Sequence, residues 1–147
     1  MKPYNKFRPF QIRWAEKMGK PECPYLIRWS FIFFGWSIRV HHWIKSDDRR
    51  FFHDHPGDLL SFVVKGKYYN VTPKGRFLAK APFIWRSKAE ERHYLDIPKE
   101  GAWTILLFWP KRRNWGFWVP KADGTDRMFR PLEYFHRYGI IQDENYQ

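Results

Sequence analysis

The sequence predicts a single, mainly β domain of antiparallel strands, folded as a barrel or as two packed sheets. From Tyr25 onward, short segments rich in β-branched and aromatic residues alternate with Pro, Gly and Asp turns. No helical pattern of roughly 10–15 residues separates successive strands, which argues against a parallel sheet of βαβ units. No repeat, low-complexity tract or flexible linker divides the 147 residues, so we expect one domain over residues 1–147.

A short helix is expected near the start of the chain, over Phe10 to Met18. Phe10 and Trp14 are spaced i, i+4, which places them on one side of a helix. Gly19 and Pro21 would end it. About ten short strands follow, separated by turn residues. They are Leu26 to Phe34, Ser37 to Lys45, Arg49 to His55, Leu59 to Lys65, Lys67 to Thr72, Arg76 to Lys80, Phe83 to Arg86, Arg92 to Ile97, Ala102 to Trp109 and Gly116 to Val119.

A second short helix is expected at the end of the chain, over Arg130 to Tyr138. Its Leu132 and Phe135 would pack against the strands. The strands between about residues 24 and 120 would then form the core of the domain.

The composition bears on location and partners. The 27 Lys and Arg residues exceed the 15 Asp and Glu residues, giving a net charge of +12 that favours nucleic acids, nucleotides and other anions as partners. The longest apolar run, Trp29 to Ile38, is shorter than the roughly 20 residues that a membrane-spanning helix needs. Cys23 is the only cysteine and the N-terminus has no signal-peptide pattern, so we expect a cytoplasmic protein without a membrane segment.

The histidines of the segment His53-Asp54-His55 are the first candidate metal ligands. In a strand, residues two apart share a face, so both rings would project to the same side from α-carbons about 6.6–6.8 Å apart. Asp54 would point to the opposite side. From this separation two imidazoles can converge on one ion, although the same spacing also fits ordinary half-buried histidines.

A carboxylate and a third histidine could complete the site. Asp58 alternates in phase with Leu60, Phe62 and Val64, an apolar set that we expect to face inward, where a carboxylate needs a partner. His93 shares a face with Leu95 and Ile97, which is again apolar. Imidazole and carboxylate together suit Fe, Mn, Zn, Ni or Cu.

The run from His53 to Asp58, followed by Gly66, resembles the first motif of the cupin superfamily. In that motif an HxH pair precedes an acidic ligand and a glycine. The usual spacing to the acidic residue is longer than the two residues found here. The resemblance implies a small double-stranded β-helix, or jelly-roll barrel, holding one divalent transition metal ion. His53, His55 and His93 would bind it, with Asp58 as a further ligand.

A closer likeness is to cupin-like proteins often encoded by tailed bacteriophages. It covers roughly residues 24–120, and host cytoplasm would then be the location. The matching segments are Pro24 to Trp29, the pair His41-His42, the run from Arg50 to Pro56, the later His93 and the closing segment Arg113 to Trp118. Cupins include dioxygenases, isomerases, decarboxylases, epimerases and non-catalytic binders, so the likeness does not fix a reaction.

Charged and aromatic residues inside the expected strands are candidates for substrate contact. If His42 faces inward with Ile38 and Val40, it could serve as a fourth ligand or, together with Asp58, as an acid or base; a purely structural role is the alternative. Arginine side chains could bind a carboxylate or phosphate through paired hydrogen bonds. The candidates for substrate binding are Arg28, Arg39, Arg86, Arg92 and Trp85.

Two function classes follow from these residues. The first is a metal-dependent enzyme acting on a small anion, with iron and O2 as the first candidate and Zn, Mn or Ni chemistry as alternatives. The second is a non-catalytic module that binds a nucleotide or nucleic acid, or a phage protein that contacts its host. A homodimer formed through exposed sheet edges is compatible with either class.

Overall fold

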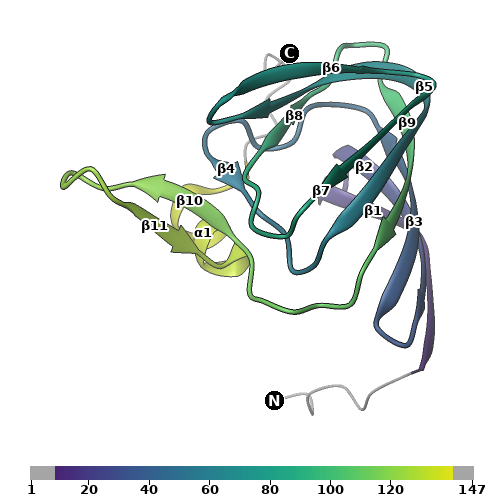
Figure 1. Cartoon of the computed structure of the whole chain (residues 1–147), viewed down its shortest axis with the longest axis horizontal. Coiled ribbons are helices and arrows are strands. Elements are labelled where there is room, and N and C mark those ends of the chain that lie inside the picture. Colours follow the sequence, from purple (N-terminus) through teal and green to yellow (C-terminus); the bar gives the residue numbers. More distant parts are fainter. Residues whose placement is uncertain (1–8, 141–147) are drawn as a thin grey trace.

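The structure is a computed structural model that describes residues 9–140, and antiparallel strands make up most of it (Figure 1). The predicted mainly β class is therefore confirmed. In chain order the elements are β1 (Phe10–Lys20), β2 (Cys23–Phe33), β3 (Trp36–Trp43), β4 (Phe52–His53), β5 (Leu59–Thr72), β6 (Gly75–Lys80), β7 (Phe83–Ser87), β8 (Tyr94–Asp96), β9 (Ala102–Phe108), β10 (Phe117–Pro120), β11 (Asp126–Phe129) and α1 (Pro131–Tyr138).

The larger sheet curves around a central cavity and has β5 as its organising strand. Its order is β1-β2-β3-β9-β5-β6, with β7 and β8 also paired to β5. Strand β5 changes partners near Gly66: residues before it pair with β7 and β9, and residues after it pair with β6 and β8. Gly66 has φ = +81°, and a Cβ there would lie 2.6 Å from the carbonyl oxygen of Gly101. A glycine is therefore needed where the long strand bends.

A smaller sheet of β11, β10 and β4 lies beside the larger one, together with α1 (Figure 1). Phe117 on β10 pairs with His53 on β4 and packs against Tyr134 of α1, with ring centroids 3.9 Å apart. Tyr134 is fully buried. This second apolar cluster fixes the short strand β4, which carries the first of the candidate metal ligands.

The two faces of the larger sheet are both partly apolar. Inward-facing residues such as Leu59, Val63 and Tyr68 are buried. Large apolar side chains also project from the outer face, where they remain exposed. They include Phe31, Ile38, Phe62, Ile84 and Ile105. Hydrophobic alternation therefore does not by itself identify the inner face of these strands.

The N-terminal helix expected over Phe10 to Met18 is wrong, because these residues form strand β1. They pair with β2, from Phe10 opposite Phe33 to Lys20 opposite Cys23. An i, i+4 pair also satisfies a period of two, and Phe10, Ile12 and Trp14 alternate along the strand as exposed side chains. Hairpin pairing with β2 satisfies the backbone hydrogen bonds that a short isolated helix would leave open.

Other boundaries shift less. The two strands expected over Leu59 to Thr72 are one continuous strand, and the hairpin partner β11 was not expected from the sequence. The C-terminal helix is present, but Leu132 is 88% exposed and Tyr134 is buried in its place. In residues 9–140, no helix is long and apolar enough to cross a membrane.

Two glycines with positive φ give a test of the close backbone packing. Gly101 has φ = +73°, and a Cβ there would overlap the carbonyl oxygen of Trp43. Gly124 has φ = +84° with nothing within 4 Å of the same position. We expect Gly124→Ala to lower the free energy of unfolding by about 1–2 kcal/mol and Gly101→Ala by about 3 kcal/mol or more. Chemical denaturation measures both, and equal losses would contradict the packing argument.

Candidate metal centre

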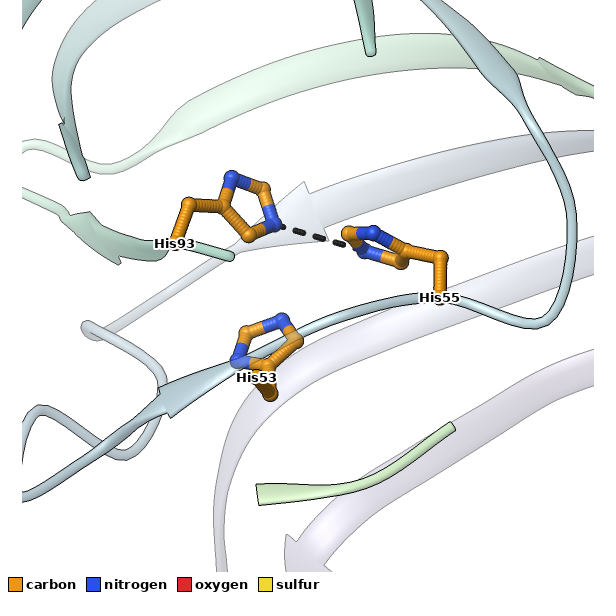
Figure 2. A group of neighbouring side chains, drawn as sticks. All are labelled: His53, His55 and His93. Carbon is orange, nitrogen blue, oxygen red and sulfur yellow. Dashed lines mark hydrogen bonds between the residues drawn. The ribbon is translucent and has the colours of Figure 1, made fainter. Parts of the chain in front are cut away.

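Three histidines from separate parts of the chain meet at one point. His53 lies on β4, His55 follows that strand, and His93 precedes β8 (Figure 2). Each offers one ring nitrogen, and these nitrogens all lie within 4.8 Å of one another. The structure thus brings together the three histidines that the sequence singled out.

Backbone pairing explains why the three rings meet. His53 and His93 form an antiparallel bridge in which each N–H donates to the other's carbonyl, at 3.0 and 2.9 Å. The N–H of His55 donates to the carbonyl of Ala89 at 3.0 Å. The HDH segment therefore runs along residues 89–93 as a short two-stranded ladder, which places the histidine side chains next to one another.

The spacing of one pair of ring nitrogens, those of His55 and His93, fits a shared metal ion. Nε2 of His93 and Nε2 of His55 are 3.3 Å apart (Figure 2). Two nitrogens that each lie about 2.0–2.1 Å from one ion are separated by about 2.8–3.4 Å at right or tetrahedral angles. Nδ1 of His93 donates to Oδ1 of Asn70 at 2.5 Å, which leaves Nε2 of the neutral ring free to bind a metal. The donor set therefore fits one divalent ion.

Burial keeps these rings neutral. It lowers the pKa of His53 to about 4, against a partial opposing effect of Asp54 and Asp48. Burial also lowers the pKa of His55 and of His93 well below the usual value, and the neighbouring histidines lower both further. Neutral imidazoles present the lone pairs that metal coordination requires.

Asp54 lies on the other side of the HDH segment, as the period of two predicts. Its carboxylate is fully buried and accepts hydrogen bonds from the Gly116 N–H and the Trp118 Nε1–H, both at 2.9 Å. It also forms an ion pair with Arg113 at 2.5 Å. The carboxylate between the two histidines therefore joins their strand to the segment that leads into β10.

The three histidines open into a cavity of about 470 Å³. Its wall includes Arg28, Arg39 and His41, which project from β2 and β3, as well as aromatic side chains such as Trp85. Apolar side chains make up most of the wall, and its charged groups include these arginines as well as the acidic residues Asp47 and Asp48. The part of the wall that carries Arg28 and Arg39 favours a small anion as ligand.

Arg39 is the uncompensated charge of this cavity. Its Nε–H donates to Oγ of Ser37 at 3.1 Å, and its guanidinium lies 4.6 Å from the centre of the Phe108 ring. No carboxylate among residues 9–140 forms an ion pair with it, whereas Arg28 is paired with Glu16 at 3.0 Å. Burial, together with the nearby Arg28, lowers the pKa of Arg39 to about 10.

The inward histidine on β3 is His41, and the expectation for His42 is wrong. His42 lies outside the cavity wall and stacks on Trp103, with ring centroids 4.1 Å apart. His41 is buried, lines the cavity, and has no hydrogen-bond partner at either ring nitrogen among the described residues. Burial, followed by the charges of Arg39 and Arg28, lowers the pKa of His41 well below its usual value.

For Asp58, too, the sequence analysis chose the wrong face of the strand as the inner one. Leu59 and Ser61 line the cavity, whereas Leu60 and Phe62 alternate with them on the outer face. Asp58 accepts a hydrogen bond from the Ala89 N–H at 2.8 Å and forms an ion pair with Arg112 at 2.8 Å. Its carboxylate is thus occupied away from the histidine cluster, although the sequence reasoning placed it inside as a ligand.

The predicted substrate contacts divide into two groups. Arg28, Arg39 and Trp85 line the cavity, and Trp85 donates its Nε1–H to the Tyr68 hydroxyl at 2.8 Å. The other two arginines lie outside the cavity wall, which corrects the expectation for them. Arg86 is exposed on the outer face near Trp109, and Arg92 pairs with Asp126 at 2.6 Å.

Sequence reasoning missed a carboxylate close to the cluster. Asp47 is buried in the segment between β3 and β4, lines the cavity, and has its Oδ2 atom 3.8 Å from Nε2 of His53. Burial raises the pKa of Asp47 well above its usual value. In the sequence it stands in Ser46-Asp47-Asp48, which has the composition of an ordinary turn.

Comparison with known proteins shows a cupin fold. No protein-family model matches the chain, and no curated protein sequence matches it significantly. Among solved structures, HppE with Fe(II) matches with a TM-score of 0.55 and 12% identity over 74% of this chain. An RmlC-like cupin from Shewanella frigidimarina matches with a TM-score of 0.54 and 14% identity over 72% of this chain and 97% of its own.

A third structure, KdgF from Halomonas sp., matches with a TM-score of 0.52 and 14% identity over 69% of this chain and 87% of its own. The match to HppE spans 62% of the HppE chain. The expected jelly-roll fold of the cupin superfamily is therefore confirmed at the level of the fold.

The histidine pKa values predict acid sensitivity of the metal-free protein. Below pH 6.5 the unfolded chain binds protons that the buried rings of the folded state do not, so stability falls as the pH drops toward about 4. His41, His55 and His93 act in the same sense. The raised pKa of Asp47 acts in the opposite sense, but it is one group against four.

Thermal unfolding with a chelator present should therefore show a falling midpoint across this pH window. A midpoint that stays constant or rises as the pH falls would contradict the neutral, buried state of these histidines.

Proposed function

We propose that this protein binds one divalent transition metal ion through His53, His55 and His93 and acts as a metal-dependent enzyme on a small anionic substrate. The observation that carries the proposal is the meeting of three neutral imidazoles in a cavity that also holds the unpaired cation of Arg39. The cupin fold supports it, because the chain shares that fold with HppE, whose structure contains Fe(II).

The donor set limits the choice of metal. Three imidazole nitrogens suit Fe, Zn, Ni, Mn or Cu, and iron is the first candidate for an oxygenase-type reaction. When bound, such an ion supplies Lewis acidity and open positions for substrate, water or O2. The hydrogen bond from His93 to Asn70 orients one ring for this role before the ion arrives.

Arg39 is assigned to the substrate anion. Its half-buried guanidinium has no ion-pair partner among the described residues and lies in the cavity wall with Arg28. A carboxylate or phosphate group would accept paired hydrogen bonds from it and would offset its charge. Arg28 is already paired with Glu16, so it contributes to the positive field more than to direct neutralisation.

His41 is assigned as the proton-transfer group in place of His42. Its ring is neutral, projects into the cavity and has both nitrogens free of hydrogen bonds within residues 9–140. One nitrogen can therefore accept a proton from a bound substrate while the other keeps its own. The burial that lowers its pKa also favours release of that proton afterward.

A non-catalytic binding module is the second candidate, favoured by the net charge of +12. It would bind a nucleotide or nucleic acid through basic surface groups, with an affinity that falls steeply with salt. Binding that survives complete metal removal and the loss of the histidine cluster would favour this alternative.

Metal content tests the proposal directly. We expect protein purified without a chelator to contain close to one equivalent of a transition metal, and His53→Ala and His93→Ala to lose most of it. His42→Ala is the matched control, because its ring lies outside the cavity and should leave the metal content unchanged. Elemental analysis by plasma mass spectrometry makes the measurement. Full metal content in both cavity variants would refute the site.

Stability measurements test the role of Arg39. Replacing an unpaired, half-buried cation by an apolar side chain of similar length removes a desolvation cost, so Arg39→Met should raise the melting temperature of the metal-free protein. Arg28→Met should lower it, because Glu16 loses its partner. Inorganic phosphate should stabilise the wild type and not Arg39→Met. Equal stabilisation of both proteins by phosphate would exclude Arg39 as the anion site.

A further inference from the structure

We propose that Asp47 supplies a carboxylate ligand to the metal ion held by the histidine cluster, in the position that motif spacing assigns to Asp58. This inference rests on the proposed function, because it takes for granted that His53, His55 and His93 bind an ion. It adds a fourth protein donor from a segment that no motif of the sequence marks.

The Asp47 carboxylate lies beside one ligand of the histidine cluster, His53. It stands outside the group of three histidine nitrogens that all lie within 4.8 Å of one another, so sharing their ion requires its side chain to move toward His55 and His93. Its Oδ2 atom lies 3.8 Å from Nε2 of His53. Donors on opposite sides of one ion, each about 2.1 Å from it, are separated by about 4.2 Å, and donors at smaller angles lie closer. A separation of 3.8 Å is too long for a hydrogen bond but within the span of a shared ion.

The backbone of β8 holds this carboxylate in place. Oδ1 of Asp47 accepts a hydrogen bond from the Leu95 N–H at 2.8 Å, two residues beyond the ligand His93. Asp47 is only 8% exposed and lines the cavity. One oxygen is thus fixed on the strand that continues from His93, and the other is directed toward His53. The hydrogen bond to the Leu95 N–H thus keeps the carboxylate on the side of the cavity where the histidine cluster lies.

Charge gives a second, independent reason. The acidic neighbours of Asp47 have cationic partners, since Asp48 pairs with Arg50 at 2.7 Å and Asp96 pairs with Arg49 at 3.0 Å. Among the ion pairs of residues 9–140, the Asp47 carboxylate has only the His53 ring as a basic partner, at 3.8 Å. A buried carboxylate in this position is costly until a cation arrives.

Asp58 differs from Asp47 in each of these respects. Its carboxylate already receives the Ala89 N–H and the guanidinium of Arg112. It is absent from the cavity wall, where Asp47 is present. Three nitrogens and one carboxylate oxygen would shift the preference of the site toward Fe(II) or Mn(II) and away from Cu(I).

Cobalt titration of matched variants tests the assignment. Asp47→Asn keeps an acceptor for the Leu95 N–H and removes the charge, and Asp58→Asn is the control. We expect Co(II) to bind Asp47→Asn at least about tenfold more weakly than the wild type, with a changed visible absorption spectrum. Asp58→Asn should match the wild type in both. The melting temperature of metal-free Asp47→Asn should equal or exceed that of the wild type. If Asp47→Asn fails to fold, the titration is repeated with Asp47→Ser.

The outcomes separate the two levels of the proposal. Wild-type affinity and spectrum in Asp47→Asn would overturn the ligand assignment while leaving the histidine site intact. Weaker binding with an unchanged spectrum would also overturn it, because Asp47 would then only position His53. A loss confined to Asp58→Asn would restore the motif-based ligand. Failure of the wild type to bind Co(II) would overturn the proposed function itself.

Discussion

The buried carboxylate of Asp54 is the interaction on which the candidate site depends. It accepts hydrogen bonds from the Gly116 N–H and the Trp118 indole and pairs with the Arg113 guanidinium, all from β10 and the segment that leads into it. A carboxylate without these donors would be strongly disfavoured at full burial, so the HDH segment and the β10 segment must come together. Because Asp54 points one way, the two histidines beside it point the other way, into the cavity.

The larger sheet carries polar and charged side chains among the apolar residues of its inner face. Arg39 and His41 project inward from β3, whereas Ile38 and Phe62 project outward and remain exposed. A cavity that receives a charged ligand needs some polar groups in its wall, and here they stand beside apolar residues such as Leu59 and Leu106. The apolar outer face is the kind of surface that a partner usually covers.

The presence of apolar residues on both faces explains which parts of the site the sequence could predict. The period of two placed His53 and His55 on one face whichever face that was, and His93 followed from the cupin resemblance. Alternation shows which residues share a face of β3, but it does not show which face points inward. The prediction therefore relied on hydrophobicity and chose His42 in place of His41. Asp47 carries no local signal, because only the tertiary fold brings its turn to His53.

A half-buried cation and a buried acidic side chain remain separate in this cavity. Arg39 has no carboxylate partner and burial raises the pKa of Asp47, yet within the described residues the two do not pair with each other. Apolar residues in both places would make a more stable protein, since unpaired buried charges cost free energy and well-packed apolar groups do not. Residues kept at such a cost are typical of functional sites. Asp47 and the histidines suit a bound cation, and Arg39 suits a bound anion. A metal ion and an anionic substrate bound side by side would require both kinds of group.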